Sequence, residues 1–278
     1  CSSTLPKLHL RTYLSCPLVL ALAAMAALPS ATDRSTTVKL RYADPADPAA
    51  FPEKHSEVEC RMQDGRAAFS SSLLMASLDS AGFGLRKSPW TGLSPKMLED
   101  PERIKTEYFP RLIKQMQHET GAPVLLPLNF VLRRSGTSSA IPAGKTQDVP
   151  ASADEFTGAI GNVHADFTEK SKAIALCRGM QEQFPYLKGG RFMLVNCWQP
   201  LRPVQSWPLA VCDARSVADE DLYSRYTVVN DNHVYNSLPD GGRHRWYFFP
   251  DMREDELLVF KSWDESPEAQ PGGKRGPG

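Results

Sequence analysis

Short apolar segments recur through the second half of the chain, and they constrain its fold more than any other feature. A single helix, residues 168–184, interrupts them, with Thr168 placed to cap it. Consecutive strands with helices mostly ahead of them predict an α+β, mainly β fold: a sandwich or barrel flanked by helices. Six segments have the length and composition of β-strands: residues 158–167, 191–198, 206–213, 225–232, 244–251 and 256–263.

The strongest helical pattern lies earlier, in residues 94–123. Pro110 is expected to break or kink this helix, and Gly121 is expected to end it. The apolar residues 124–134 then predict a buried strand, and the polar residues 135–155 predict a loop long enough to form a lid. The helix prediction rests on four apolar residues at helical spacing: Ile104, Tyr108, Leu112 and Met116.

The charge balance points away from polyanionic partners. Lysine plus arginine and aspartate plus glutamate both number 32, so the chain has no net field to hold nucleic acid or an anionic membrane. A small molecule recognised in a local pocket is the expected partner. The six cysteines include no CxxC pair, which favours neither a zinc site nor a disulfide scaffold, and Cys177, Cys197 and Cys212 are expected to be reduced core thiols.

The two ends differ in composition from the middle. Residues 1–35 predict a leader that is a targeting sequence or disordered, with an apolar run too short for a stable membrane span. The proline-rich residues 43–54 predict a linker or an extended arm within a domain of residues 36–264, and residues 265–278 predict a disordered tail. We expect a cytoplasmic protein; secretion or organelle import is the alternative if the leader is a targeting sequence.

His164 and Asp166 are the first candidates for a functional site. Residues two apart on a strand point to the same face, so this imidazole and this carboxylate could hold one metal ion. The spacing alone is weak evidence, since shuffling this composition gives some His-x-Asp pair in roughly one arrangement in three. The alternative is that Asp166 caps the following helix and orients a half-buried His164.

Longer segments around this pair resemble a known family. Their order and spacing are similar to those of the fungal asaB-type hydroxylase/desaturase family, which is related to bacterial cephem methoxylases and to a gibberellin desaturase. Weaker similarity reaches back through "LDSAGFGLRKSP", "EYFPRLIKQMQHETGA" and "FVLRR", so the resemblance covers roughly residues 65–264 and favours the metal interpretation. The three main blocks are "VHADFT" (163–168), "GRFMLVNCWQPLRPVQSWPLAVCDARSV" (190–217) and "HRWYFFPDMREDELLVFKSWDE" (244–265).

The resemblance implies an enzyme that uses non-haem Fe(II), O₂ and 2-oxoglutarate to hydroxylate or desaturate a small organic molecule in secondary metabolism. It also implies a double-stranded β-helix, the jelly-roll or cupin-like barrel, as the core of the fold. Two histidines and one carboxylate on one side of Fe(II) leave positions open for the co-substrate and O₂. His164 and Asp166 match the first two of these ligands.

Three residues of the strand at 191–198 are candidates for binding the co-substrate. Asn196 and Trp198 share a strand face, and Arg191 opens the strand. An inward arginine could form a bidentate pair with a carboxylate of 2-oxoglutarate or of the substrate. Otherwise Arg191 is a surface residue at a strand end.

The chain departs from the family pattern at the third metal ligand. The family has a second histidine shortly after the block that reads "FKSWDE" here, whereas residues 266–278 contain no histidine. His244 and His233 are the downstream candidates to replace it, although His233 is expected in a polar turn, and His118 is expected to be structural at a helix end. A catalytically inactive relative, or a small-molecule-binding protein on the same fold, therefore stays an alternative.

Overall fold

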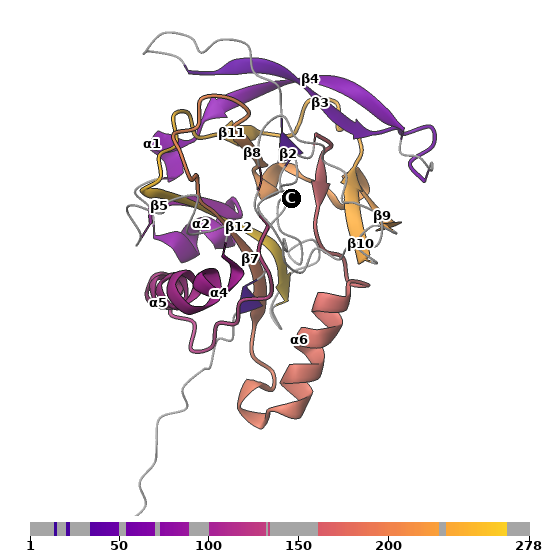
Figure 1. Ribbon diagram of the computed structural model, residues 1–278. Coiled ribbons are helices and arrows are strands. Elements are labelled where there is room, and N and C mark those ends of the chain that lie inside the picture. The colour runs from indigo at the N-terminus through magenta and orange to yellow at the C-terminus, as the bar shows by residue number, and fades with distance from the viewer. Residues whose placement is uncertain are drawn as a thin grey trace, which may run out of the picture.

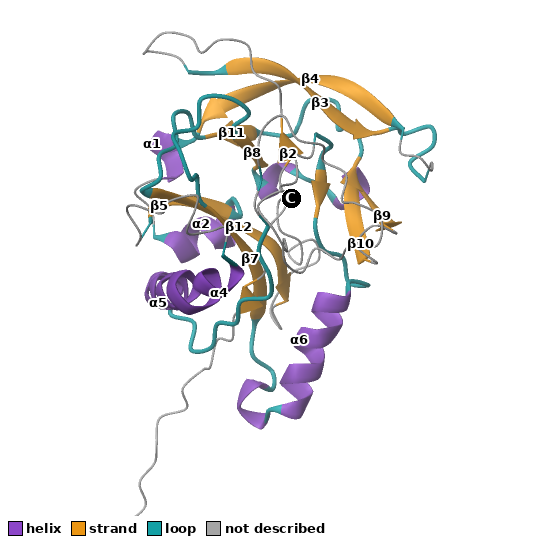
Figure 2. Ribbon diagram, viewed as in Figure 1, coloured by secondary structure: helices purple, strands orange, loops and turns teal. Residues whose placement is uncertain are grey.

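The strands of the protein form three sheets, and helices lie along one side and at one end of them (Figure 1, Figure 2). The sheets bring together strands from all parts of the chain, so residues far apart in sequence meet in the interior. The computed structural model describes residues 14–15, 21–22, 34–49, 54–69, 73–88, 100–131, 133, 161–227 and 232–265.

The first sheet has four strands in the order β1-β7-β12-β5. The whole of β7 pairs antiparallel with β12, and the register shifts between Lys261 and Trp263, so Ser262 is the extra residue of a β-bulge. The bulge turns Trp263, which pairs with Leu194, into the apolar interior. The strands are β1 (Leu14–Ser15), β5 (Phe83–Lys87), β7 (Phe192–Trp198) and β12 (Glu256–Glu265).

The second sheet has the order β2-β8-β11-β4-β3, and the third, smaller sheet has the order β6-β10-β9. In Figure 1 the long β3–β4 hairpin arches over the other strands. The strands of the second sheet are β2 (Ala21–Leu22), β3 (Thr36–Ala43), β4 (His55–Asp64), β8 (Leu209–Cys212) and β11 (Trp246–Phe248). Those of the third sheet are β6 (His164–Ala165), β9 (Leu222–Thr227) and β10 (Asn232–Ser237).

An apolar core joins the first two sheets. Phe83 of β5 and Phe260 of β12 pack with Val211 of β8, and all three are at most 1% exposed. Side chains alternate between the two faces of β7. Phe192 and Leu194 point inward, and Met193 and Val195 point outward. Burial of these strands explains why they are nearly continuous apolar runs in the sequence.

Helices cover the outer face of the first sheet. Leu74 and Leu78 of α2 (Leu74–Ser80) and Met116 of α5 (Phe109–Thr120) pack on Met193 and Val259. Figure 1 shows these helices beside β7 and β12, with α6 at the far end. The remaining helices are α1 (Arg66–Phe69), α4 (Pro101–Arg103) and α6 (Lys172–Gln183).

The helix predicted at 94–123 is present in its described part and is continuous from Pro101 to Thr120. Asp100 caps its start by accepting from the backbone N–H of Glu102 at 3.0 Å, and Gly121 ends it with a φ of 69°. The π-helical segment Ile104–Tyr108 lies directly before Pro110, which has no N–H to donate. The helix therefore widens at this proline and does not break there.

The strand predicted at 124–134 is wrong for the described residues of that range. Only isolated bridges occur there, at Val124, Pro127 and Arg133. Pro127 cannot donate to a ladder, so the apolar run packs against neighbouring side chains without forming a regular strand.

Two local predictions around α6 are also wrong. The helix begins at Lys172 after Ser171, not after Thr168, because Thr168 Oγ1 accepts from the N–H of Lys170 at 3.1 Å in a turn before the helix. His233 lies in β10 and not in a polar turn. The backbone oxygen of His233 accepts a hydrogen bond of 2.8 Å from Ser171, which ties the start of α6 to this strand.

The six predicted strands correspond to β6, β7, β8, β9, β11 and β12, although β9 begins at Leu222, three residues before the predicted start, and β6 has only two residues. Among the described residues, no helix is long and apolar enough to cross a membrane. Cys177 and Cys212 are buried free thiols, as expected, whereas Cys197 is free but only partly buried. The predicted loop 135–155, most of the leader 1–35 and residues 266–278 lie outside the described residues.

Candidate metal centre

His164 sits on a strand held by its neighbour β10. β6 pairs antiparallel with β10, and His164 lies opposite Asn236. The Nδ1 atom of His164 is 2.8 Å from the carbonyl oxygen of Asn162. A carbonyl only accepts, so Nδ1 carries the hydrogen and the lone pair of Nε2 is left for a metal ion, the arrangement typical of metal-binding histidines.

The carboxylate of Asp166 is directed toward the Nε2 atom of His164. His164 Nε2 and Asp166 Oδ1 are 3.5 Å apart, and both residues are buried, at 8% exposure each. Two donor atoms about 2.1 Å from one ion and separated by an angle of about 90–110° would lie roughly 3.0–3.4 Å apart. The observed separation fits two ligands of one ion with little adjustment, and we call these two residues the candidate metal centre.

The other carboxylate oxygen of Asp166 is held by the protein. Asn196 on β7 donates from Nδ2 to Asp166 Oδ2 at 2.9 Å and to Ser262 Oγ at 2.8 Å. Ser262 Oγ lies 3.4 Å from the same Oδ2. Asn196 is fully buried and Ser262 is 1% exposed, so this support is shielded from water.

The alternative interpretation of Asp166 as a helix cap is wrong. Ser171 occupies the N-cap position of α6, and Asp166 is directed to Asn196, Ser262 and His164. The strand pair thus brings an imidazole and a carboxylate together, as the sequence predicts.

Arg133 is a positive charge near this centre that the sequence analysis did not identify. Burial lowers the pKa of Arg133 to about 10, and the negative charge of Asp166 opposes that shift. The guanidinium is still charged near neutral pH at such a value. It can therefore offer a half-buried cation to an anionic ligand bound beside Asp166.

The predicted replacements for the third metal ligand, His233 and His244, lie elsewhere. The ring centroid of His233 is 5.3 Å from that of Tyr226, and His118, expected to be structural, is in the last turn of α5. Within the parts of the chain that the structure describes, no third histidine, cysteine, aspartate or glutamate joins the candidate metal centre in a group that could hold an ion.

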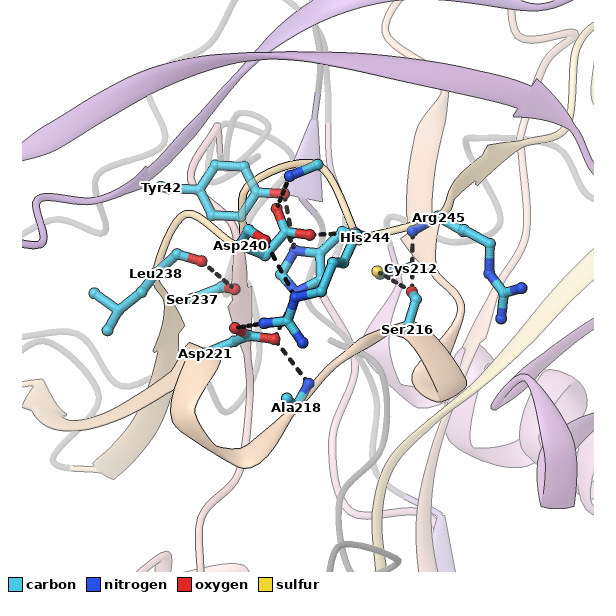
Figure 3. Close-up of polar contacts among 12 residues, drawn as sticks. Tyr42, Cys212, Ser216, Ala218, Asp221, Ser237, Leu238, Asp240, His244 and Arg245 are labelled. Atoms are coloured by element: carbon cyan, nitrogen blue, oxygen red, sulfur yellow. Dashed lines mark hydrogen bonds and ion pairs between the residues drawn. The ribbon is translucent and has the colours of Figure 1, made fainter.

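His244 belongs to a different polar cluster, which Figure 3 shows. Its Nδ1 is 3.1 Å from the hydroxyl of Tyr42, and its Nε2 is 3.1 Å from Asp221 Oδ2. Arg243 donates to the other oxygen of Asp221 at 2.6 Å, and Asp240 accepts from the backbone N–H of His244. Both ring nitrogens of His244 already have protein partners, so this residue links Tyr42 of β3 to Asp221.

The three predicted co-substrate residues separate in space. Asn196 and Trp198 lie on the inner face of β7, and Trp198 packs against the apolar core between the sheets. Arg191 is directed away from them: it pairs with Asp264 at 2.6 Å and with Asp79 of α2 at 2.5 Å. Because α2 covers the outer face of the sheet, the structure does not bring Arg191 to the candidate metal centre.

Comparison with known proteins identifies the family. A family model described as an oxidoreductase/YMDC permease-like domain matches residues 29–275. The chain belongs to this family. Its relatives confirm the asaB-type hydroxylase/desaturase prediction, since they include proteins that carry that name.

Two relatives and one solved structure illustrate the likeness. Hydroxylase/desaturase efuI of Hormonema carpetanum is 31% identical over 200 residues, which is 68% of this chain and 66% of efuI. Alpha-ketoglutarate-dependent dioxygenase phiK of Fungal sp. (strain ATCC 74256) is 27% identical over 236 residues, 82% of each chain. The chain thus spans just under two thirds of the length of efuI.

The solved structure of the iron and alpha-ketoglutarate-dependent endoperoxidase NvfI superposes with a TM-score of 0.61 at 20% identity, over 87% of this chain and 88% of NvfI. The two proteins share a fold. This confirms a mainly β architecture of curled sheets with flanking helices.

Proposed function

We propose that this chain is an Fe(II)- and 2-oxoglutarate-dependent oxygenase that hydroxylates or desaturates a small organic molecule in secondary metabolism. One observation carries the proposal: His164 Nε2 and Asp166 Oδ1 converge to 3.5 Å in a buried site. The names of efuI, a hydroxylase/desaturase, and phiK, an alpha-ketoglutarate-dependent dioxygenase, support the same reaction class.

The donor set fits Fe(II). One neutral imidazole nitrogen and one carboxylate oxygen are two of the three ligands in the usual site of non-haem Fe(II) oxygenases, and the third ligand is not assigned here. Bound Fe(II), with O₂ and 2-oxoglutarate, supplies the oxidising power that removes hydrogen from an unactivated C–H bond. The protein contributes binding, orientation and exclusion of water.

The residues around the centre have defined parts in this proposal. The Asn162 carbonyl fixes the tautomer and ring orientation of His164, and Phe167 and Leu194 belong to an apolar cluster that keeps bulk water away. Excluding water matters because it strengthens the attraction between the ion and its anionic ligands.

We further propose that Arg133 binds a carboxylate of the co-substrate. The sequence-based candidate for this part, Arg191, is committed to Asp264 and Asp79 on the other side of β7. Arg133 is half-buried and lies close enough to Asp166 for their charges to interact. Trp198 and the inner face of β7 then form part of the wall of the pocket.

The finer structural predictions belong to the same proposal. The sheets would form a double-stranded β-helix within a single domain of residues 36–264. The match of the family model to residues 29–275 supports the single domain. The equal numbers of acidic and basic residues, 32 of each, favour a small-molecule partner over nucleic acid. A cytoplasmic location, where the thiols of Cys177 and Cys212 would stay reduced, remains a prediction.

Anaerobic titration with Fe(II) in the presence of 2-oxoglutarate tests the proposal. We expect the weak visible absorption of a metal-bound 2-oxoglutarate chelate in the protein and its loss in His164→Ala. His118→Ala, which removes an imidazole outside the centre, is the matched control and should titrate like the unmodified chain. Identical titrations of the unmodified protein and His164→Ala would refute the assignment and favour the alternative of an inactive or merely ligand-binding relative.

A further inference from the structure

We propose that Asn196 and Ser262 are positioning residues that make Asp166 a one-oxygen ligand, fixing Oδ2 to the protein and presenting Oδ1 to the metal. This inference rests on the proposed function. It assigns to Asn196 a part different from direct contact with 2-oxoglutarate, and it brings in Ser262, which no sequence motif marks.

The hydrogen bonds determine how the amide of Asn196 is oriented. Its nitrogen lies 2.9 Å from Asp166 Oδ2 and 2.8 Å from Ser262 Oγ, so its two hydrogens have two acceptors. The flipped amide would place its oxygen against a carboxylate oxygen, with two acceptors and no hydrogen between them. The observed orientation is the one that binds an ionised Asp166.

Ser262 closes a triangle with these groups. Its hydroxyl accepts from Asn196 and is 3.4 Å from Asp166 Oδ2, so the hydroxyl hydrogen is directed to the carboxylate. Ser262 lies two residues after the inward Phe260 on β12, so strand alternation places its side chain on the same inner face as Asn196.

The two oxygens of Asp166 are therefore not equivalent. Oδ2 has two protein partners, while Oδ1 faces His164 Nε2. A carboxylate held in this way cannot swing to bind the ion through both oxygens without giving up both hydrogen bonds, and so it leaves one more coordination position open.

The oxygen atom of the same amide indicates that a ligand binds beside it. Asn196 Oδ1 has no hydrogen-bond partner among the described residues, although Asn196 is fully buried. A buried acceptor without a partner is uncommon in proteins. Beside a metal centre it is suited to accept from a donor group of a bound molecule.

The test measures metal affinity separately from folding. Mn²⁺, which takes the same nitrogen and oxygen donors as Fe²⁺, is titrated calorimetrically into the full chain and into Ser262→Ala and Asn196→Ala. Removing such a partner of a metal ligand weakens metal affinity by about 10–100-fold in other proteins. We expect losses in that range for both variants, with the larger loss for Asn196→Ala because it removes two hydrogen bonds.

Two matched variants keep the result interpretable. Ser77→Ala removes a hydroxyl that is equally buried, at 3% exposure, on α2 outside the sheet, and it should bind Mn²⁺ like the unmodified chain. Ser262→Thr keeps the hydroxyl and should restore most of the affinity. Unfolding temperatures with and without Mn²⁺ add an independent measure: a purely structural role lowers both equally, whereas a positioning role reduces the stabilisation by Mn²⁺.

The outcomes separate this inference from the proposed function. If Mn²⁺ binding requires His164 but Ser262→Ala and Asn196→Ala match Ser77→Ala, the positioning role is refuted and the oxygenase proposal stands. If the unmodified chain does not bind Mn²⁺, or binds it no more tightly than His164→Ala does, the proposed function is refuted, and the inference is refuted with it.

Discussion

Asp264→Asn should destabilise the protein by about 3–5 kcal/mol, the usual effect of removing one partner from a buried ion pair. Asp264 is on β12 with its side chain 5% exposed, and it accepts from Arg191 at 2.6 Å and from Lys261 Nζ at 2.8 Å. The Lys261 side chain is itself only 7% exposed. Asparagine keeps the shape of the side chain but removes the charge partner of the buried Lys261 and leaves Arg191 with Asp79 alone.

Asp79→Asn provides a matched control on the same arginine. Asp79 also pairs with Arg191, at 2.5 Å, but its side chain is 43% exposed, and exposed pairs contribute about 0–1 kcal/mol. Urea unfolding at neutral pH measures both free energies. If the two variants agree within 1 kcal/mol, or if Asp264→Asn weakens 2-oxoglutarate binding with no loss of stability, then Arg191 is not the structural residue described above.

The same pair predicts a pH dependence. Burial would raise the pKa of Asp264, but the hydrogen bond from Arg191 and the charge of Lys261 outweigh it and hold that pKa below its ordinary value. A depressed folded-state pKa means that the stabilisation is complete above the unfolded value, about 4, and is lost as the pH falls through the folded value. The difference between the unmodified protein and Asp264→Asn should therefore be full at pH 6 and shrink below about pH 4.

Two further predictions concern the site and the cluster of Figure 3. Arg133→Gln should raise the 2-oxoglutarate concentration needed for half-saturation at least about tenfold, as expected for the loss of a charge-assisted hydrogen bond. The affinity for Mn²⁺ should change little. Equal losses of 2-oxoglutarate and Mn²⁺ affinity would contradict the proposed role of Arg133. Asp221→Asn should cost about 3–5 kcal/mol in thermal unfolding, because Asp221 is 3% exposed and accepts from both His244 and Arg243, and it should leave metal affinity unchanged. Arg243→Ala, which removes the half-exposed partner, should cost under about 1 kcal/mol.

The apolar parts of β7 and β12 could be predicted from the sequence because burial imposes a pattern on them, whereas the sequence analysis did not predict β3, β4 or β5. β7 and β12 are buried on both faces, and their residues 192–195 and 257–260 are continuous apolar runs that stand out from the turns around them. β6 and β10 are less regular. The predicted segment 158–167 contains only the two residues of β6, and four of the six residues of β10 are polar, so each strand exists because its partner supplies hydrogen bonds.

The two ligands of the candidate metal centre could be predicted from the sequence, whereas the residues that support them could not. His164 and Asp166 are two residues apart, so strand geometry alone predicts that they meet. Their support by Asn196 and Ser262 depends on the pairing of β7 with β12, which cannot be read from the spacing of residues along the chain. The position of Arg191 was open for a related reason, since it precedes β7 and its direction is set by Asp79 and Asp264.

The measurement that bears most directly on the central claim is a crystal structure of the protein grown anaerobically with Fe²⁺ or Mn²⁺, with anomalous diffraction to locate the ion. We expect one anomalous peak about 2.0–2.3 Å from both His164 Nε2 and Asp166 Oδ1, with Asp166 Oδ2 still bound to Asn196. An ion elsewhere, or a structure in which the His164 and Asp166 side chains diverge with no ion between them, would contradict it.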